Sequence, residues 1–175
     1  MSIFSDKIKN ILNKKNISIY KLSKLIDYHE GALNAMINSK KSIPENVKVK
    51  LLLTLDVSKE EFEGWILADK YTKEVLKLAI ESKKSFPFKR KSILTARIDN
   101  ILKNINMSRT TLSKKIVYNQ SGLNRMITGK INMSKPVLEK VSSILGISQN
   151  EILSWILADQ YNLQTLETAY SCITS

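Results

Sequence analysis

Hydrophobic residues recur along the chain at intervals of three and four, which places them on one face of an α-helix. Ile8, Ile11 and Leu12 show this spacing near the N-terminus. Polar residues that favour helix caps stand between such segments, and the chain holds only 5 glycines and 3 prolines. We therefore predict an all-α protein of short helices joined by short polar turns.

The helical pattern occurs twice. The segment WILADKY at residues 65–71 returns as WILADQY at residues 155–161. A shift of 90 residues aligns residues 3–79 with residues 93–169 without a gap, and 30 of the 77 pairs are identical. We interpret the chain as a tandem duplication. Its predicted parts are repeat one (1–84), a basic linker (85–91) and repeat two (92–175).

Each repeat reads as about six short helices. Ser18 and Ser108 are placed as N-caps of the second helix, and residues 58–61 and 148–151 are capping boxes that open the fifth. The first helix is centred on Ile8 to Leu12, and the others are expected at residues 29–37 and 119–128 (third), 45–55 and 135–145 (fourth), and 73–82 and 164–173 (sixth).

The repeated WILAD segment lies near the end of the fifth helix. We predict that Trp65, Ile66, Ala68 and Tyr71 pack in the core, with a docking surface between repeats or between chains as the alternative. Asp69 and its counterpart Asp159 are candidates to cap the following helix.

Charge narrows the class of partner. The net charge is +12, with +5 in residues 1–85, +3 in 86–91 and +4 in 92–175. Such a balance favours a polyanion, either nucleic acid or an anionic membrane surface. The sequence has no apolar run of about 20 residues and no signal-peptide pattern. A single cysteine, Cys172, fits a reducing cytoplasm, so we expect a cytoplasmic, nucleoid-associated protein.

Two segments carry the functional signal. They are NISIYKLSKLIDYHEGALNAMINSKK (16–41) and NMSRTTLSKKIVYNQSGLNRMITGKI (106–131). In each segment a small residue stands where two helices would cross steeply. It is Ser23 in the first segment and Ser113 in the second. Around it stand apolar residues at matching intervals, namely Leu22, Ile26, Tyr28, Leu33 and Met36, and Leu112, Ile116, Tyr118, Leu123 and Met126. Each segment resembles the helix-turn-helix of the phage-repressor-type (lambda-repressor-like, Xre/Cro) family, over residues 3–70 and 93–160.

The resemblance implies that the third helix of each repeat enters the major groove of DNA, N-terminal residues first. Its candidate base readers are Asn119, Gln120, Ser121, Asn124 and Arg125 in repeat two, and His29, Glu30 and Asn34 in repeat one. Asparagine and glutamine can pair with adenine, and arginine with guanine, whereas Glu30 would repel phosphate. We therefore expect repeat two to supply most of the base specificity.

Basic residues near the motif are candidate phosphate contacts. They are Arg109, Lys130, Lys40, Lys41, Lys89, Arg90 and Lys91. The alternative is that these residues lie on solvated helix faces and that the linker is a solvated hinge.

The motif departs from the family at the turn. The family favours glycine there, for a positive φ, where this chain has Asp27 and Val117. Because a β-branched valine adopts that conformation poorly, the sequence predicts a remodelled turn in repeat two.

Nothing in the sequence indicates catalysis. His29 is the only histidine, and there is neither a glycine-rich phosphate loop nor a Cys/His cluster, so we expect no enzyme, no metal and no cofactor. The function expected is sequence-specific binding of double-stranded DNA, as a transcriptional repressor of a phage or plasmid type. Two alternatives stay open: a helix-turn-helix scaffold that binds and inhibits a protein, and a phage or plasmid maintenance DNA binder. A homodimer and a protein partner are also open, and no membrane is expected.

Overall fold

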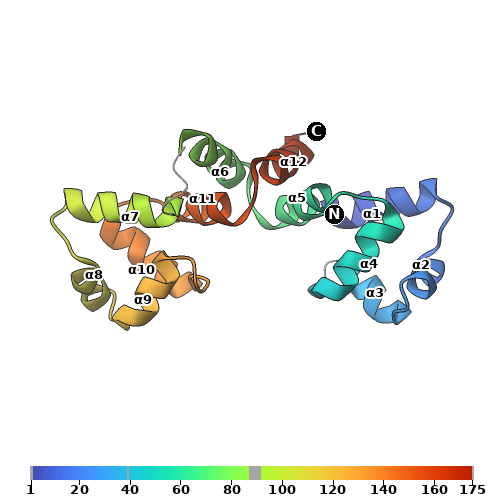
Figure 1. Cartoon of the computed structure of the whole chain (residues 1–175), viewed down its shortest axis with the longest axis horizontal. Coiled ribbons are helices and arrows are strands. Elements are labelled where there is room, and N and C mark those ends of the chain that lie inside the picture. The colour runs from blue at the N-terminus through green and yellow to red at the C-terminus, as the bar shows by residue number, and fades with distance from the viewer. Residues whose placement is uncertain (1, 39, 87–91, 175) are drawn as a thin grey trace. The chain divides into compact units, whose positions relative to one another are not determined.

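The computed structural model describes residues 2–38, 40–86 and 92–174. These residues form twelve α-helices and no β-strand, which confirms the all-α fold class (Figure 1). The helices are α1 (Ile3–Lys14), α2 (Ile19–Leu25), α3 (Glu30–Ile37), α4 (Glu45–Leu55), α5 (Lys59–Lys70), α6 (Lys73–Ser85), α7 (Ile93–Asn104), α8 (Arg109–Lys115), α9 (Gln120–Ile127), α10 (Lys135–Leu145), α11 (Gln149–Gln160) and α12 (Leu163–Thr174). Residues 87–91 of the predicted linker lie outside the described residues.

The chain divides into two compact units. Unit 1 consists of Met1–Lys73 and Glu167–Ser175, and unit 2 consists of Glu74–Leu166. Unit 1 therefore holds α1 to α5 with the C-terminal part of α12, whereas unit 2 holds α7 to α11 with nearly all of α6. Nearly all of α6 belongs to the predicted repeat one (1–84) but lies in unit 2. α12 belongs to the predicted repeat two (92–175), but most of it lies in unit 1. The duplication itself stays a prediction from the sequence.

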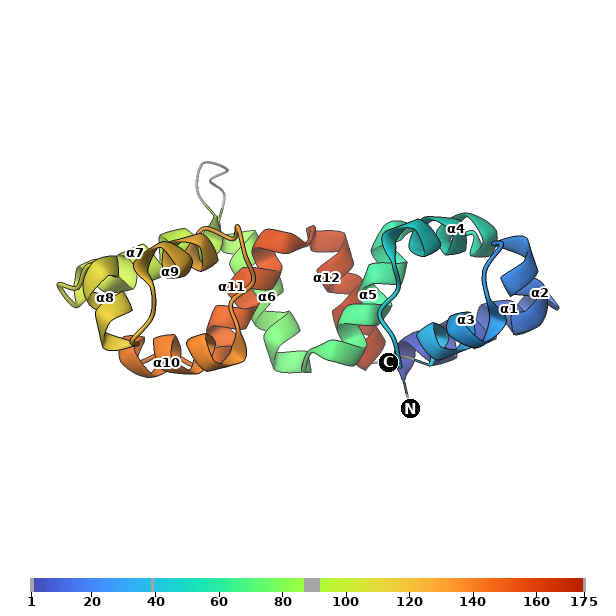
Figure 2. The same ribbon diagram turned by 90° about the horizontal axis from the view of Figure 1, so that it is seen from below.

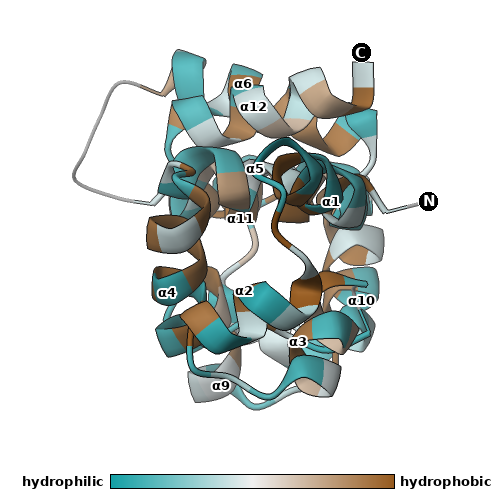
Figure 3. Cartoon of the chain, turned by 90° about the vertical axis from the view of Figure 1, so that its right-hand side faces the viewer, coloured by the Kyte–Doolittle hydropathy of each residue, from teal (hydrophilic) through white to brown (hydrophobic). Residues whose placement is uncertain are grey.

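One apolar face of each helix forms the core of its unit. In unit 1, Phe4, Ile8 and Leu12 follow one another at four-residue intervals along α1 and are all buried. The Phe4 ring meets the Phe62 ring edge-on, with centroids 5.1 Å apart. The hydrophobic residues alternate with hydrophilic ones along the helices, as the hydropathy colouring in Figure 3 shows. The hydrophobic residues that recur at helical spacing in the sequence are therefore the residues that are buried in the core.

The core of unit 2 repeats this arrangement. Leu94, Ile98 and Leu102 lie at the same spacing on α7 and are buried. Trp155, from the repeated segment, is part of this core, as Trp65 is part of the core of unit 1. Of the residues predicted to pack in the core, Trp65 and Ala68 are buried, Ile66 is partly buried against the unit 1 core, and Tyr71 is half-buried and lies outside that core.

Helix starts follow the predicted caps. The Ser18 side chain accepts from the N–H of Lys21, and Ser108 does the same with Thr111. The capping boxes that open α5 and α11 are both present, each with a serine and a glutamate three residues later.

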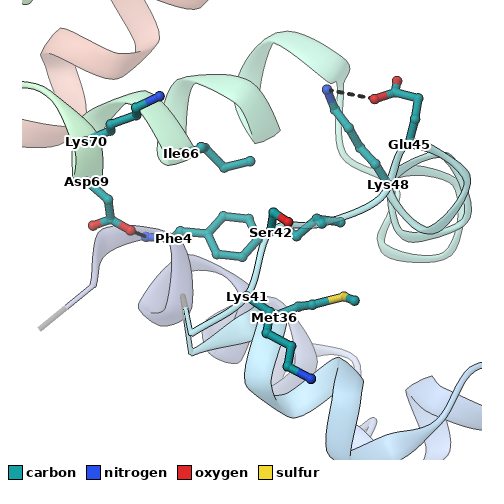
Figure 4. A pocket seen from close by; sticks show the side chains of 10 residues that line it. Phe4, Met36, Lys41, Ser42, Glu45, Lys48, Ile66, Asp69 and Lys70 are labelled. Atoms are coloured by element: carbon teal, nitrogen blue, oxygen red, sulfur yellow. Dashed lines mark hydrogen bonds and ion pairs between the residues drawn. The ribbon is translucent and has the colours of Figure 1, made fainter. Parts of the chain in front are cut away.

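The predicted role of the repeated aspartate is wrong. The Asp69 carboxylate does not cap the following helix. At the start of α1 it accepts hydrogen bonds from the backbone N–H groups of Ile3, at 2.7 Å, and of Phe4, at 3.2 Å (Figure 4). The following helix of the second copy, α12, is instead capped by Asn162, whose Oδ1 accepts from the N–H of Thr165. The aspartate thus ties the end of the fifth helix to the exposed amides that begin the first.

Candidate nucleic-acid interface

The two helix-turn-helix segments fold as their small residues require. Ser23 on α2 and Ser113 on α8 are 2% and 3% exposed. Each hydroxyl donates to a backbone carbonyl of its own helix, that of Tyr20 or Thr110, at 2.8 Å. Both serines are thus small buried residues whose hydroxyls are satisfied within their own helices, as a position at a helix crossing would require.

The apolar positions of the motif are buried, apart from the tyrosines. Tyr28 is half-buried against the unit 1 core, while Tyr118 is 39% exposed and lies outside the unit 2 core. The buried positions are Leu22, Ile26, Leu33 and Met36, and Leu112, Ile116, Leu123 and Met126.

The turn between the two helices is the same in both units. Asp27 has a φ of 50° and Val117 a φ of 53°, so the predicted remodelling of the second turn is wrong. Val117 is 83% exposed, and its branched side chain therefore meets solvent rather than packed neighbours. A backbone hydrogen bond of 2.9 Å, from Tyr118 to the carbonyl of Ser113, closes the turn around it. The valine adopts an unfavourable backbone conformation because the turn demands it.

A lysine that the sequence reasoning missed supports each turn. The Lys140 ammonium donates to the carbonyl of Ile116, the C-cap of α8, at 3.1 Å. Lys50 makes the same bond to Ile26 at 2.8 Å. A cation at a helix C-terminus satisfies a free carbonyl and interacts favourably with the helix dipole. The sequence could have indicated this role, because Lys50 and Lys140 occupy matching positions in the two repeats.

The five predicted base readers of repeat two lie together, four on α9 and the fifth, Asn119, at its N-cap. Figure 2 shows α9 beside α8 in unit 2. An open groove of about 560 Å³ runs along this face, lined by Asn119, Gln120, Ser121, Asn124, Arg125, Thr128 and Lys130. The lining includes two basic residues and no carboxylate. Such a surface is suited to a negatively charged partner that presents both hydrogen-bond donors and acceptors.

Local bonds hold part of this face in place. The Asn119 side chain caps α9 by accepting from the N–H of Gly122 at 2.9 Å. The Gln120 amide donates to the Thr110 hydroxyl at 2.8 Å, which links α9 to α8. Asn124 differs, because its buried Oδ1 has no hydrogen-bond partner among the described residues. A buried acceptor left unsatisfied is costly, and this oxygen would have to become exposed before it could accept from a base.

The corresponding face of α3 in unit 1 is less suited to DNA. His29 caps α3 through Nδ1, and Glu30 places a carboxylate in the first turn. The Asn34 amide oxygen already accepts from the side chain of Asn38 at 2.8 Å. An occupied amide and an added negative charge both disfavour direct contact with a base edge beside phosphates.

The candidate phosphate contacts have varied surroundings. Lys130 and Lys40 are exposed directly after α9 and α3. Arg109 is held by Asp99 through two contacts of 2.7 and 2.8 Å, and a phosphate contact would require this ion pair to open. Lys41 lines a different groove, of about 500 Å³, whose apolar wall includes Phe4, Met36 and Ile66 (Figure 4). Lys89, Arg90 and Lys91 lie outside the described residues.

The described residues offer neither a metal site nor a membrane-spanning helix. No group of three histidine, cysteine or acidic side chains is placed to hold a metal ion within residues 2–38, 40–86 and 92–174. Over the same part of the chain, none of the helices combines the length and the apolarity needed to span a membrane.

Comparison with known proteins bears on the second helix-turn-helix. No curated protein and no solved structure matches the chain. A family model described as a Cro/C1-type HTH DNA-binding domain matches residues 97–158, which run from α7 through most of α11. This segment contains both helices of the second motif and the whole groove of α9. Residues 97–158 are therefore similar to a Cro/C1-type helix-turn-helix DNA-binding domain.

Proposed function

We propose that this chain is a sequence-specific double-stranded-DNA-binding protein that acts as a transcriptional repressor and reads bases mainly with α9. The observation that carries the proposal is the groove in which all five candidate base readers of repeat two meet Lys130. It belongs to the segment that matches a DNA-binding family. Asn119, Gln120 and Asn124 carry amides of the kind that pairs with adenine, and Arg125 carries a guanidinium of the kind that pairs with guanine. Asn119 and Gln120 would first have to release their bonds to Gly122 and Thr110.

Repression would follow from occupancy of the operator. A third helix seated in the major groove blocks the promoter, or the site of another protein, without any chemical step. The net charge of +12 strengthens binding because cationic side chains displace counterions from the DNA backbone. Lys130 and Lys40 are exposed candidate phosphate contacts that follow α9 and α3.

A second function is favoured for unit 1. Glu30 adds a negative charge to α3, and Asn34 is bonded to Asn38. On this proposal, unit 1 anchors the chain on a dissimilar half-site, or it has lost base reading and binds a protein. The same helix-turn-helix scaffold then serves both as a DNA reader and as an interaction module.

Selection of random duplex DNA by the purified protein, at about 150 mM salt, tests the proposal. A two-part motif with centres about 10 base pairs apart is expected if both units read bases, and a single half-site if only α9 does. Enrichment of no sequence would contradict the proposal and favour a protein partner. The same selection with Asn124→Ala and Arg125→Ala combined identifies which part of the motif α9 reads.

A further inference from the structure

The C-terminal part of α12 belongs to the packing of unit 1. α12 comes close to α5 at Gly64, where an added Cβ would lie 2.8 Å from Cγ2 and 2.9 Å from Cβ of Thr168. It would also lie 3.2 Å from the backbone nitrogen of Ala169, which cannot move aside alone. Cys172 packs against the unit 1 core one turn further along. Apart from proline, glycine is the least favoured residue in a helix interior, and here it lets α12 approach α5 closely.

α6 belongs in the same way to the packing of unit 2. The Lys83 ammonium donates to the carbonyl of Ala158 on α11 at 2.6 Å. At the other end of α6, Glu74 accepts from the Asn150 amide at 2.9 Å. Phe86, directly after the helix, packs against the unit 2 core. α6 is thus bound to unit 2 from its first turn to the residue after its end.

The two sixth helices carry the same buried pair of side chains. Leu76 and Ala79 on α6 are each 0% exposed, as are Leu166 and Ala169 on α12. The fifth helices differ at one position, where α5 has Gly64 and α11 has Ser154. Ser154 is 1% exposed, and it lines a common surface with Leu78 and Ser82 of α6. Each pairing of a fifth with a sixth helix therefore joins one helix from each repeat.

We propose that the sixth helix of each repeat is the docking partner of the fifth helix of the other repeat, so that neither helix-turn-helix unit is complete without a segment of its neighbour in sequence. The arrangement is the single-chain counterpart of a dimer formed by exchange of identical helices. Its consequence is reciprocal. Loss of α12 weakens the N-terminal helix-turn-helix, and loss of α6 weakens the C-terminal one. The proposal goes beyond DNA binding and is tested without DNA.

Matched leucine substitutions in the full-length chain test whether α12 packs on α5, as proposed, or on α11 of its own repeat. Gly64→Leu and Ser154→Leu place the same side chain at equivalent positions of α5 and α11. Cys172, the single cysteine, reports the docking of α12 through its rate of reaction with an aromatic disulfide reagent. We expect Gly64→Leu to raise that rate about tenfold or more and Ser154→Leu to change it less than about twofold. The reverse order, or equal effects, would overturn the proposal.

Two further variants guard against general unfolding. Gly64→Ala adds only the methyl group that meets Thr168, and we expect it to raise the rate at Cys172 by a smaller factor. Phe86→Ala is the complementary change, read by hydrogen exchange followed by mass spectrometry. We expect faster exchange in α7 to α11 and unchanged exchange in α1 to α5. Faster exchange confined to α1 to α5 would show that α6 packs on its own repeat and would refute the exchange.

Discussion

The carboxylate of Asp159, at the end of α11, accepts a hydrogen bond of 2.7 Å from the backbone N–H of Ile93, the first residue of α7. Its second oxygen accepts from Leu94 at 3.0 Å. We expect Asp159→Ala to lower the free energy of unfolding by about 1 kcal/mol, because two amides at a helix start lose their acceptor and a favourable charge. Urea unfolding followed by circular dichroism measures it.

The equivalent change in unit 1 is the control for that prediction. Asp69→Ala removes the equivalent two bonds at the start of α1 and also a bond of 2.6 Å from the Ser2 hydroxyl, so we expect a loss at least as large. Unchanged stability in both variants would mean that these bonds contribute nothing beyond what water offers.

Val117 stores backbone strain in the turn between α8 and α9. Its φ is 53° and its side chain is 83% exposed, so little packing is lost when the side chain is removed. We expect Val117→Gly to stabilise unit 2 by up to about 1 kcal/mol, the cost of a left-handed residue less the added flexibility of glycine in the unfolded chain. Thermal unfolding measures the gain. Asp27→Gly should give less, since aspartate tolerates this conformation better, and a destabilised Val117→Gly would contradict the idea of strain.

Local chemistry was readable from the sequence. The capping serines, the buried Ser23 and Ser113, and the gathering of the α9 residues all depend on neighbours within a few turns of helix. Periodicity and cap rules describe that range. Strain at Val117 was also foreseen, but its outcome was misjudged, because exposure of the side chain could not be read from the residue type.

Long-range pairing was not readable. Asp69 could serve any nearby helix start, and its choice of α1 depends on how α1 packs along α5. The sixth helices present a harder case. α6 and α12 both carry a buried leucine and a buried alanine at matching positions. The sequence therefore does not show which fifth helix each of them packs against. Only the folded units distinguish the two, through contacts such as that of Lys83 with Ala158.

The asymmetry between α9 and α3 predicts unequal effects on base preference. Asn124→Ala and Arg125→Ala should each cost about 1–3 kcal/mol at the preferred site and relax the choice of base there. Asn34→Ala should cost less, because Asn38 already occupies its side-chain oxygen. Competition binding against single-base variants of the selected site compares the three. If Asn34→Ala proved the most damaging, our ranking of the two reading helices would be wrong.

Lys130 should act through charge alone. It is exposed directly after α9 and lines the same groove as the base readers, which suits a phosphate contact. We expect Lys130→Ala to weaken binding to specific and random duplexes by similar factors. It should also reduce the slope of log affinity against log salt by about 0.9, the value for one phosphate contact on B-form DNA. Titrations between about 50 and 200 mM salt measure that slope. Lys77→Ala is the matched control, because Lys77 lies on α6 beside Glu81 and should leave the slope unchanged. An equal reduction of the slope in both variants would show that the salt dependence reflects the net charge of the chain rather than a phosphate contact at α9.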